Sequence, residues 1–371
     1  MTASGSELPA PASANARALL RFPDRRTTWA VVAAATLAAP VDRLQDRLEA
    51  LHRAVPMTGA RLRGEIWHPG PPPDPLIVDG DPLAAADLVD RFDLATHPPL
   101  RVVAGSGGLR LAVACHHAAF DGLSLVALLA ALLNAAPRGA GFETDPAEAG
   151  LEAAPVGSGP ARSWPEVRGL LGRALRPADR VAASLARPGR EALAVREVGL
   201  AGAGVAARVA EAAVAAAGAR NSRLGRPWRR VGLNFGLAGL PGGGGGVGNS
   251  SRYRRVDLRP GEPVGPALAA ALASPREPLD QVWSPRWGWL LEPVVGRFSD
   301  SLLISNLGRR EVPGATRLEF FPVARGRSAV AVGAVGLAGG SSTVSVRARD
   351  LTSEDAEALL DDLVARLVAD R

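Results

Sequence analysis

The sequence predicts an α/β protein made of two lobes. Three observations support this: the chain has 371 residues, about the length of two domains; strand and helix patterns alternate along it; and residues 135–165, rich in Ala, Gly and Pro, separate two such series. We therefore expect an N-terminal lobe over residues 1–150 and a C-terminal lobe over residues 151–371. Hydrophobic residues make up 47% of the chain, which excludes a disordered protein.

Hydrophobic periodicity places the elements of the first lobe. A buried strand is expected at Thr28–Ala38, and the apolar residues of Val41–Val55 recur at helical spacing. Ala60–Trp67 predicts a further strand. In Leu109–His116 the larger apolar residues alternate with other residues, which is the period of a strand. The apolar stretch Leu123–Leu133 then predicts a helix.

The second lobe shows the same mixture of patterns. Helical segments rich in Arg, Ala and Leu come first, and a helix beginning near Thr352 closes the chain. Between them, four stretches predict strands, the last two joined by a Gly-Gly turn: Trp228–Phe235, Asp300–Asn306, Ala329–Ala338 and Ser342–Ala348.

Charge and cysteine content exclude several classes of protein. Basic residues number 43 against 37 acidic ones, all of the basic ones are Arg, and the isoelectric point is near 10.9. Such a value is typical of nucleic-acid binders, but Arg residues scattered along the whole chain explain it without a nucleic-acid partner, and we expect none. The single cysteine excludes an intrachain disulfide and a Cys-rich zinc module.

The N-terminal segment predicts no export and no membrane insertion. The first 18 residues are rich in Ala, Ser and Pro and lack the basic start and apolar core of a secretory signal. The apolar run at Trp29–Ala39 is far shorter than the roughly 20 residues that a membrane span needs. We expect a cytoplasmic monomer without a membrane span.

One segment, Cys115–Gly122, has the residue types of a catalytic site. Two histidines, a spacer of three residues and Asp-Gly lie between a predicted strand and a predicted helix. A neutral imidazole at a strand end can accept a proton near neutral pH, and Asp121 can fix the loop or bind an arginine. A metal site built from His116, His117 and Asp121 is disfavoured, because adjacent strand residues point to opposite faces.

This HHxxxDG pattern resembles the active-site motif of the chloramphenicol acetyltransferase-like superfamily. The closest resemblance is to the condensation domains of nonribosomal peptide synthetases and to related stand-alone HHxxxDG acyltransferases. The segment Arg91–Arg101 resembles the one that precedes the motif strand in these proteins. Val231–Phe235 with Val247–Ser250, and Ile304–Gly308, resemble elements of their second lobe.

The resemblance implies two chloramphenicol-acetyltransferase-like lobes with a substrate tunnel at their interface. His117 would be the general base for a hydroxyl or amine acceptor that attacks a thioester, carried by coenzyme A or by the phosphopantetheine arm of a carrier protein. Asp121 would orient the loop through an arginine, and His116 would support the loop. Gly122 would keep the tunnel open and offer its backbone amide to the reacting oxygen. No permanently bound cofactor and no metal are implied.

The sequence departs from this family at the arginine that would partner Asp121. The usual position holds Gly59, which leaves Arg61 or Arg63 as substitutes.

Several further residues have both a functional and a structural interpretation. Ser305 and Asn306 would line the tunnel, or would be ordinary polar residues at a strand end. The stretch at 252–255 would bind a phosphate or an acidic carrier protein, or would be an exposed solubilising stretch; its arginines are Arg252, Arg254 and Arg255. Three tryptophans would stack on bases or, as we favour, pack a loop: Trp283, Trp287 and Trp289.

The favoured function is acyl transfer from a thioester to a small-molecule acceptor, in bacterial secondary metabolism or lipid biosynthesis. One alternative is a free-standing condensation domain that forms an amide or ester from substrates bound to acyl or peptidyl carrier proteins. Another is a condensation-like module without catalysis that recruits partners. The intact His-His and Asp-Gly pairs favour an enzyme, because a docking surface has no need of them.

Overall fold

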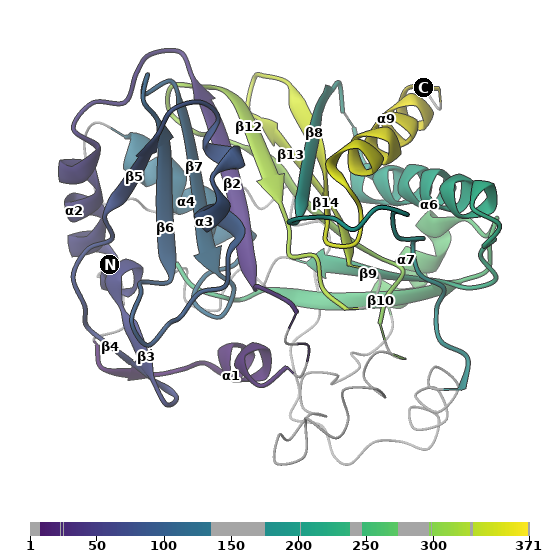
Figure 1. Cartoon of the computed structure of the whole chain (residues 1–371), viewed down its shortest axis with the longest axis horizontal. Coiled ribbons are helices and arrows are strands. Elements are labelled where there is room, and N and C mark those ends of the chain that lie inside the picture. The colour runs from purple at the N-terminus through teal and green to yellow at the C-terminus, as the bar shows by residue number, and fades with distance from the viewer. Residues whose placement is uncertain are drawn as a thin grey trace.

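Two large β-sheets stand beside one another in the computed structural model (Figure 1). The structure describes residues 8–22, 24, 26–134, 175–200, 202–237, 247–273, 297, 299–326 and 329–369. The expected boundary after residue 150, the stretch at 135–165 and the three tryptophans Trp283, Trp287 and Trp289 lie outside these residues.

The helices alternate with the strands along much of the chain. The helices are α1 (Ala14–Leu20), α2 (Leu44–Ala54), α3 (Ala86–Val89), α4 (Gly122–Leu133), α6 (Val205–Arg223), α7 (Val264–Ala273) and α9 (Ser353–Ala369). The strands of the first half are β1 (Ala10–Pro11), β2 (Ala30–Leu37), β3 (Arg61–Arg63), β4 (Ile66–His68), β5 (Pro75–Val78), β6 (Leu100–Gly105) and β7 (Arg110–His116). Those of the second half are β8 (Ala192–Val198), β9 (Val231–Leu237), β10 (Arg252–Leu258), β11 (Leu302–Arg310), β12 (Ala315–Phe321), β13 (Val330–Leu337) and β14 (Ser342–Ala348).

The first lobe is a five-stranded sheet of order β12-β2-β7-β6-β5 with helices α2, α3 and α4 packed on it. Strand β2 consists of small and β-branched apolar residues, nearly all of them buried. Such an uninterrupted apolar strand belongs in the middle of a sheet that is covered on both faces. Helix α4 is apolar almost all round and is capped at its N-terminus by Asp121, so its start is fixed directly after the HHxxxDG segment.

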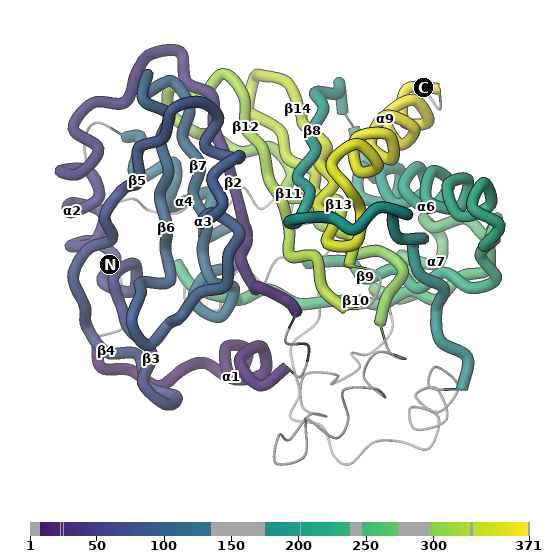
Figure 2. Tube along the Cα trace, viewed as in Figure 1, coloured from purple at the N-terminus to yellow at the C-terminus, as the bar shows by residue number. Residues whose placement is uncertain are grey.

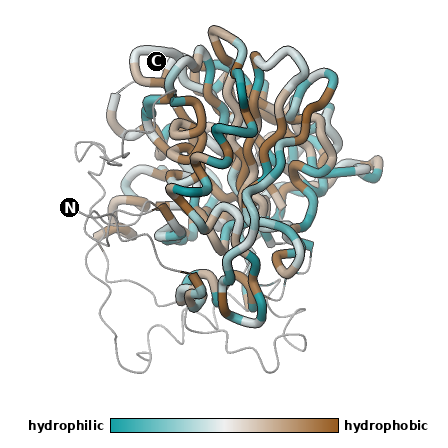
Figure 3. Tube along the Cα trace, turned by 90° about the vertical axis from the view of Figure 1, so that its left-hand side faces the viewer, coloured by the Kyte–Doolittle hydropathy of each residue, from teal (hydrophilic) through white to brown (hydrophobic). Residues whose placement is uncertain are grey.

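The second lobe is a six-stranded sheet of order β10-β9-β11-β13-β14-β8 with two different faces. Val231, Leu233 and Phe235 of β9 share a hydrophobic core with residues of α6, α7 and α9. The residues between them, such as Asn234 and Gly236, must point away from this core, because side chains alternate along a strand. This second face is directed toward the first lobe. Figure 3 turns the first lobe toward the viewer, and hydrophobic stretches run along neighbouring strands there.

Strand β12 connects the two lobes. It follows the second lobe's β11 in sequence, yet it pairs antiparallel with β2 of the first lobe, and Figure 2 shows the two strands side by side. Thr343 Oγ1 on β14 donates to the carbonyl oxygen of Leu318 on β12 over 2.7 Å. The sheet of the first lobe is therefore completed by residues 315–321, from the C-terminal half of the chain.

Most of the predicted elements agree with the structure. The predicted strand and helix on either side of the HHxxxDG segment are β7 and α4, and the predicted strands after Asp300 overlap β11, β13 and β14. The single strand predicted at Ala60–Trp67 is wrong. Gly64, with φ of 62°, turns the chain there, and β3 and β4 form a hairpin instead.

The contact between β12 and the second sheet gives a stability prediction. A Cβ atom at Gly333 on β13 would overlap the carbonyl oxygen of Phe320 and lie 2.6 Å from Ser345 Oγ. Gly333→Ala should therefore lower the free energy of unfolding by about 1–3 kcal/mol, measured by urea denaturation. Gly107→Ala is the matched control, because a Cβ there meets nothing within 4 Å. Equal unfolding midpoints for the two variants would contradict this packing.

Candidate active site

The HHxxxDG segment forms a tight loop between β7 and α4. The His116 carbonyl oxygen accepts a hydrogen bond of 2.9 Å from the Ala119 amide, which turns the chain back on itself. The His117 amide donates to the carbonyl oxygen of Trp29 over 2.8 Å, so the loop is also fixed to the residue before β2. Both histidines and Asp121 are buried.

His117 is held as a neutral imidazole with a defined tautomer. Its Nδ1 lies 3.1 Å from the carbonyl oxygen of Phe120. Since a carbonyl oxygen only accepts, Nδ1 carries the proton and Nε2 carries the lone pair. Burial lowers the pKa of His117, and the carboxylate of Asp121 opposes this to a smaller extent. The proton-accepting atom of the candidate base is therefore Nε2, which is directed toward the second lobe.

Tyr253 of β10 reaches this atom. Its hydroxyl oxygen lies 2.7 Å from His117 Nε2, and the two rings meet edge to face at 79°. Because Nε2 carries the lone pair, Tyr253 is the donor of this hydrogen bond. Tyr253 is absent from the residues that the motif singles out. A signal was available, since it is the only tyrosine of the sequence and it interrupts the arginines at 252–255.

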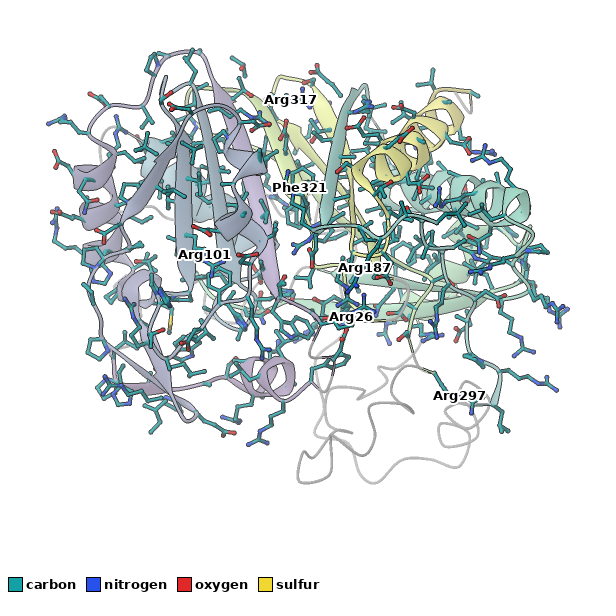
Figure 4. All side chains as sticks on the ribbon, in the orientation of Figure 1. Arg26, Arg101, Arg187, Arg297, Arg317 and Phe321 are labelled. Atoms are coloured by element: carbon teal, nitrogen blue, oxygen red, sulfur yellow. The ribbon has the colours of Figure 1, made fainter. Side chains whose placement is uncertain are left out.

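His116 points to the opposite side of the loop and supports it. Its Nδ1 accepts a hydrogen bond of 3.1 Å from the Ala118 amide, and its ring meets that of Phe92 edge to face at 5.7 Å. The guanidinium of Arg101 lies 3.8 Å from the centre of the Phe92 ring. Figure 4 labels Arg101 on the first lobe. Burial lowers the pKa of His116 to about 3, and the neighbouring His117, Arg91 and Arg101 contribute to a smaller extent. His116 is therefore neutral near pH 7.

The carboxylate of Asp121 joins the two lobes. One oxygen accepts from the Ser124 amide over 2.8 Å, as the N-cap of α4. The other accepts from the amide and the hydroxyl of Ser250, over 2.9 and 3.0 Å. Ser250 lies in the second lobe, two residues before the start of β10. One side chain thus fixes both the start of a first-lobe helix and a second-lobe segment.

Neighbouring groups reinforce this junction. The Asp121 amide donates to the carbonyl oxygen of Gly248 over 3.0 Å, and the Ser124 hydroxyl lies 2.7 Å from the same oxygen. The side-chain amide of Asn249 donates to the His117 carbonyl oxygen over 2.6 Å. We call the set Asp121, Ser124, Gly248, Asn249 and Ser250 the clasp. Through Asn249, the clasp also holds the backbone of the candidate base.

The expected arginine partner of Asp121 is not found among the described residues. Arg61 donates instead to the carbonyl oxygen of Thr96 over 2.8 Å and to that of Ala60 over 3.2 Å. Arg63 is exposed on β3, in the separate three-stranded sheet β1-β4-β3. Asp121 needs no cation, because three N–H and O–H donors and the N-terminus of a helix stabilise its charge.

Gly122 has a packing role. A Cβ atom there would lie 2.9 Å from the Phe320 ring and 3.2 Å from a methyl group of Leu307. Phe320 belongs to β12, and its neighbour Phe321 lies between the lobes in Figure 4. The lack of a side chain at Gly122 therefore lets the connecting strand pack against the start of α4.

The remaining candidates on the second sheet differ from one another. Ser305 of β11 pairs in register with Gly236 on one side and Gly333 on the other. Asn306 turns back on its own strand, where its side-chain oxygen accepts from the Gly308 amide over 3.0 Å. The structure therefore places Ser305, but not Asn306, in the row of β10 and β9 residues that contains Tyr253.

Arg255 belongs to a buried charged network rather than to an exposed stretch. Its guanidinium lies 3.1 Å from one carboxylate oxygen of Asp300. The other oxygen accepts from Asn234 over 2.8 Å and lies 3.8 Å from Arg325. Arg325 in turn lies over the Tyr253 ring, 4.1 Å from its centre. The prediction of an exposed solubilising stretch is therefore wrong for Arg255.

Two other kinds of site are missing from the described residues. No group of three or more His, Cys, Asp and Glu side chains could hold a metal ion there. Burial raises the pKa of the Cys115 thiol well above its usual value, which makes a nucleophilic thiolate unfavourable. Within the same residues, no helix has the length and apolar character needed to cross a membrane.

The sequence matches no protein-family model and no curated protein. Among solved structures, the first condensation domain of the calcium-dependent antibiotic synthetase, in complex with a substrate analogue, has a TM-score of 0.63 and 18% identity over 97% of this chain and 96% of that one. A mutant starter condensation domain of rhizomide synthetase, in complex with C8-CoA and Leu-SNAC, has a TM-score of 0.61 and 13% identity over 97% and 94%.

A third structure is similar over the same length. The condensation domain from Monacolin K polyketide synthase has a TM-score of 0.54 and 13% identity, over 97% of this chain and 96% of that one. Together these likenesses show that the chain has the α/β fold of condensation domains, as the HHxxxDG segment predicted.

The clasp gives a prediction for Asp121. Asp121→Asn replaces one carboxylate oxygen with an amide group that faces an N–H donor, whichever way the side chain turns. We expect the free energy of unfolding to fall by about 1–3 kcal/mol, the cost of an unsatisfied buried polar group, measured by urea denaturation. Asp74→Asn, at an exposed position, should leave the midpoint unchanged. An Asp121 variant as stable as the control would show that the clasp contributes nothing.

The two buried histidines predict a loss of stability in acid. Their pKa values are lowered in the folded chain, that of His116 to about 3, whereas an unfolded histidine titrates near about 6.5. Below about pH 6.5 the unfolded chain therefore binds protons that the folded chain rejects, and each histidine lowers stability by up to about 1.4 kcal/mol per pH unit.

The contribution of His116 can be isolated by substitution. In His116→Asn the side-chain oxygen can still accept from the Ala118 amide, but nothing titrates. Between pH 7 and pH 5, its urea midpoint should fall less than that of the unsubstituted protein. An identical fall in both proteins would show that His116 does not resist protonation.

Proposed function

We propose that this protein is an acyltransferase that moves an acyl group from a thioester to the hydroxyl or amine of a small-molecule acceptor, with His117 as general base. One observation carries the proposal. The tautomer of His117 is fixed by the Phe120 carbonyl, so that the Nε2 lone pair is directed to the place where the two lobes meet. A neutral, oriented imidazole is what proton abstraction from an acceptor requires.

The chemistry follows from this geometry. As the acceptor attacks the thioester carbonyl, its proton leaves toward His117 Nε2 and a new C–O or C–N bond forms. The tetrahedral intermediate then collapses, the C–S bond breaks and the thiolate takes the proton from the imidazolium. Since a thiolate is a good leaving group, one histidine can serve both steps.

The proposal that the acyl donor is a thioester rests on the similarity of fold. The similar starter condensation domain of rhizomide synthetase is in complex with C8-CoA and Leu-SNAC, which supports acyl-coenzyme A or a carrier-bound phosphopantetheine thioester as the donor here. We propose that donor and acceptor meet in a tunnel between the N-terminal lobe of residues 1–150, whose sheet is completed by β12, and the C-terminal lobe of residues 151–371. Within it Gly122 offers its backbone amide to the reacting oxygen, and Ser305 lines the wall.

Asp121 would affect the reaction only by positioning other residues. Its carboxylate is fully engaged within the clasp, so it has no role in carrying protons. It holds the loop that presents His117, while His116 holds the same loop from the first-lobe side.

The test is thiol release from acyl thioesters in the presence of hydroxyl and amine acceptors. His117→Ala should lower the rate by about 10²–10⁴-fold, the usual contribution of a positioned base. His97→Ala, at an exposed histidine, is the control and should keep the full rate. Circular dichroism and thermal unfolding should show that both variants are folded.

The outcomes separate the alternatives. Full activity of His117→Ala would overturn the assignment of the base. The same acyl group offered on coenzyme A and on a carrier protein distinguishes a stand-alone acyltransferase from a free-standing condensation domain. Absence of thiol release with every donor and acceptor pair would contradict catalysis and favour a recruitment module.

A further inference from the structure

The hydroxyl of Tyr253 donates a hydrogen bond to the lone pair of His117 Nε2, and His117 needs this lone pair to act as a base. The oxygen lies 2.7 Å from Nε2, and Tyr253 is the donor of the hydrogen bond. An acceptor substrate cannot bond to Nε2 at the same time, because a neutral imidazole has one acceptor nitrogen. Either the acceptor displaces the phenol, or the proton passes through it.

The tyrosine ring is held on two sides. It packs against a small apolar cluster of Leu303, Ala324 and Ala331 on the second lobe. The guanidinium of Arg325 lies 4.1 Å from the ring centre. To leave His117, the ring would have to give up both contacts.

Arg325 is itself held in place by the carboxylate of Asp300. Arg325 and Arg255 lie on opposite oxygens of Asp300, at 3.8 and 3.1 Å, and Asn234 donates to the same carboxylate over 2.8 Å. Arg255, Asn234 and Asp300 are largely buried. A cation held at the face of a phenol stabilises the negative charge that develops when the phenol gives up its proton.

We propose that Tyr253 is a catalytic residue that relays the proton from the acceptor to His117. The inference rests on the proposed acyl transfer. As the acceptor N–H or O–H bond breaks, its proton joins the phenolic oxygen, and the original phenolic proton joins His117 Nε2. The acceptor forms its bond to the thioester carbonyl carbon, and the C–S bond then breaks. The thiolate finally takes the proton from the imidazolium, which leaves Tyr253 and His117 as they began.

Gly236 and Ser305 lie in the same row of the second sheet as Tyr253. Gly236 pairs with Tyr253 across β9 and β10. Among the described residues, the nearest atoms to a Cβ built at Gly236 belong to Ser305 and to the Ile304 backbone. Ser305 Oγ would lie 3.1 Å from that Cβ, so the lack of a side chain at Gly236 lets the serine hydroxyl lie in the row beside the tyrosine.

The first test is Tyr253→Phe, which keeps the ring, its packing and its contact with Arg325 but removes the hydroxyl. We expect kcat for thiol release to fall about 10²-fold or more, with little change in KM for the acceptor. Arg259→Gln, at an exposed position directly after β10, is the control and should keep kcat. If Tyr253→Phe is as fast as or faster than the unsubstituted protein, the acceptor displaces the phenol and the relay is wrong.

The second test uses the fact that Tyr253 is the only tyrosine. Growth on 3-fluorotyrosine places fluorine at this position alone and makes the phenol more acidic. A relay predicts that the alkaline limb of the kcat profile moves to lower pH. An unchanged profile together with an unchanged kcat would overturn the relay.

Fluorine NMR of the same protein provides a readout that does not depend on turnover. Replacing His117 by Ala removes the acceptor that stabilises the protonated phenol, so the fluorotyrosine resonance should titrate at lower pH than in the unsubstituted protein. Identical titrations would show that the hydrogen bond is absent, which overturns the relay. If the shift is seen, and if His117→Ala loses activity while Tyr253→Phe keeps its activity, then the proposed function stands and only the relay is overturned. A protein without any thiol release overturns both.

Discussion

The site depends on the hydrogen bonds that the carboxylate of Asp121 accepts from both lobes. This carboxylate is the point where the helix after the motif and the segment before β10 share one acceptor group. A carboxylate at a helix N-terminus is stabilised by the N–H groups and the helix dipole, so a cation there would be redundant. Because Ser250 is three residues from Tyr253 in sequence, the same carboxylate sets the distance between the tyrosine and His117.

The interface between the lobes buries polar groups among apolar ones such as Leu307, Val335 and Leu337, and these polar groups make it specific. Arg347 of β14 is fully buried and lies against Glu191 and the hydroxyl of Thr28. Thr343 and Ser345 of the same strand donate to backbone oxygens of β12. Buried polar groups are costly unless they are paired, so only one arrangement of the lobes satisfies all of them. The polar groups on the inner face of the second sheet thus help to position the reactive centre.

Local patterns predicted what depends on local structure. The alternation in β7 and the Asp-Gly before an apolar stretch placed His116, His117 and the start of α4 correctly. The sequence suggested Arg61 or Arg63 as the partner of Asp121. The actual partners could not be predicted, because they are uncharged amides and hydroxyls, some of them from a distant segment, that stabilise the carboxylate in place of a cation. Strand β12 joins the first sheet through a pairing with β2 nearly 300 residues earlier in the sequence, and no local periodicity reports such a pairing.

The arginines explain why the high isoelectric point says little about partners. Arg101 donates to the carbonyl oxygens of Asp87, Asp90 and Arg91, at 2.5 to 3.1 Å, and so satisfies the end of α3. A guanidinium has five N–H donors in a fixed fork, so one side chain can bind several carbonyls and still cover the Phe92 ring. Its charge also disfavours protonation of His116. Part of the positive charge thus has a structural role on the first lobe, where Arg101 also helps to keep His116 neutral.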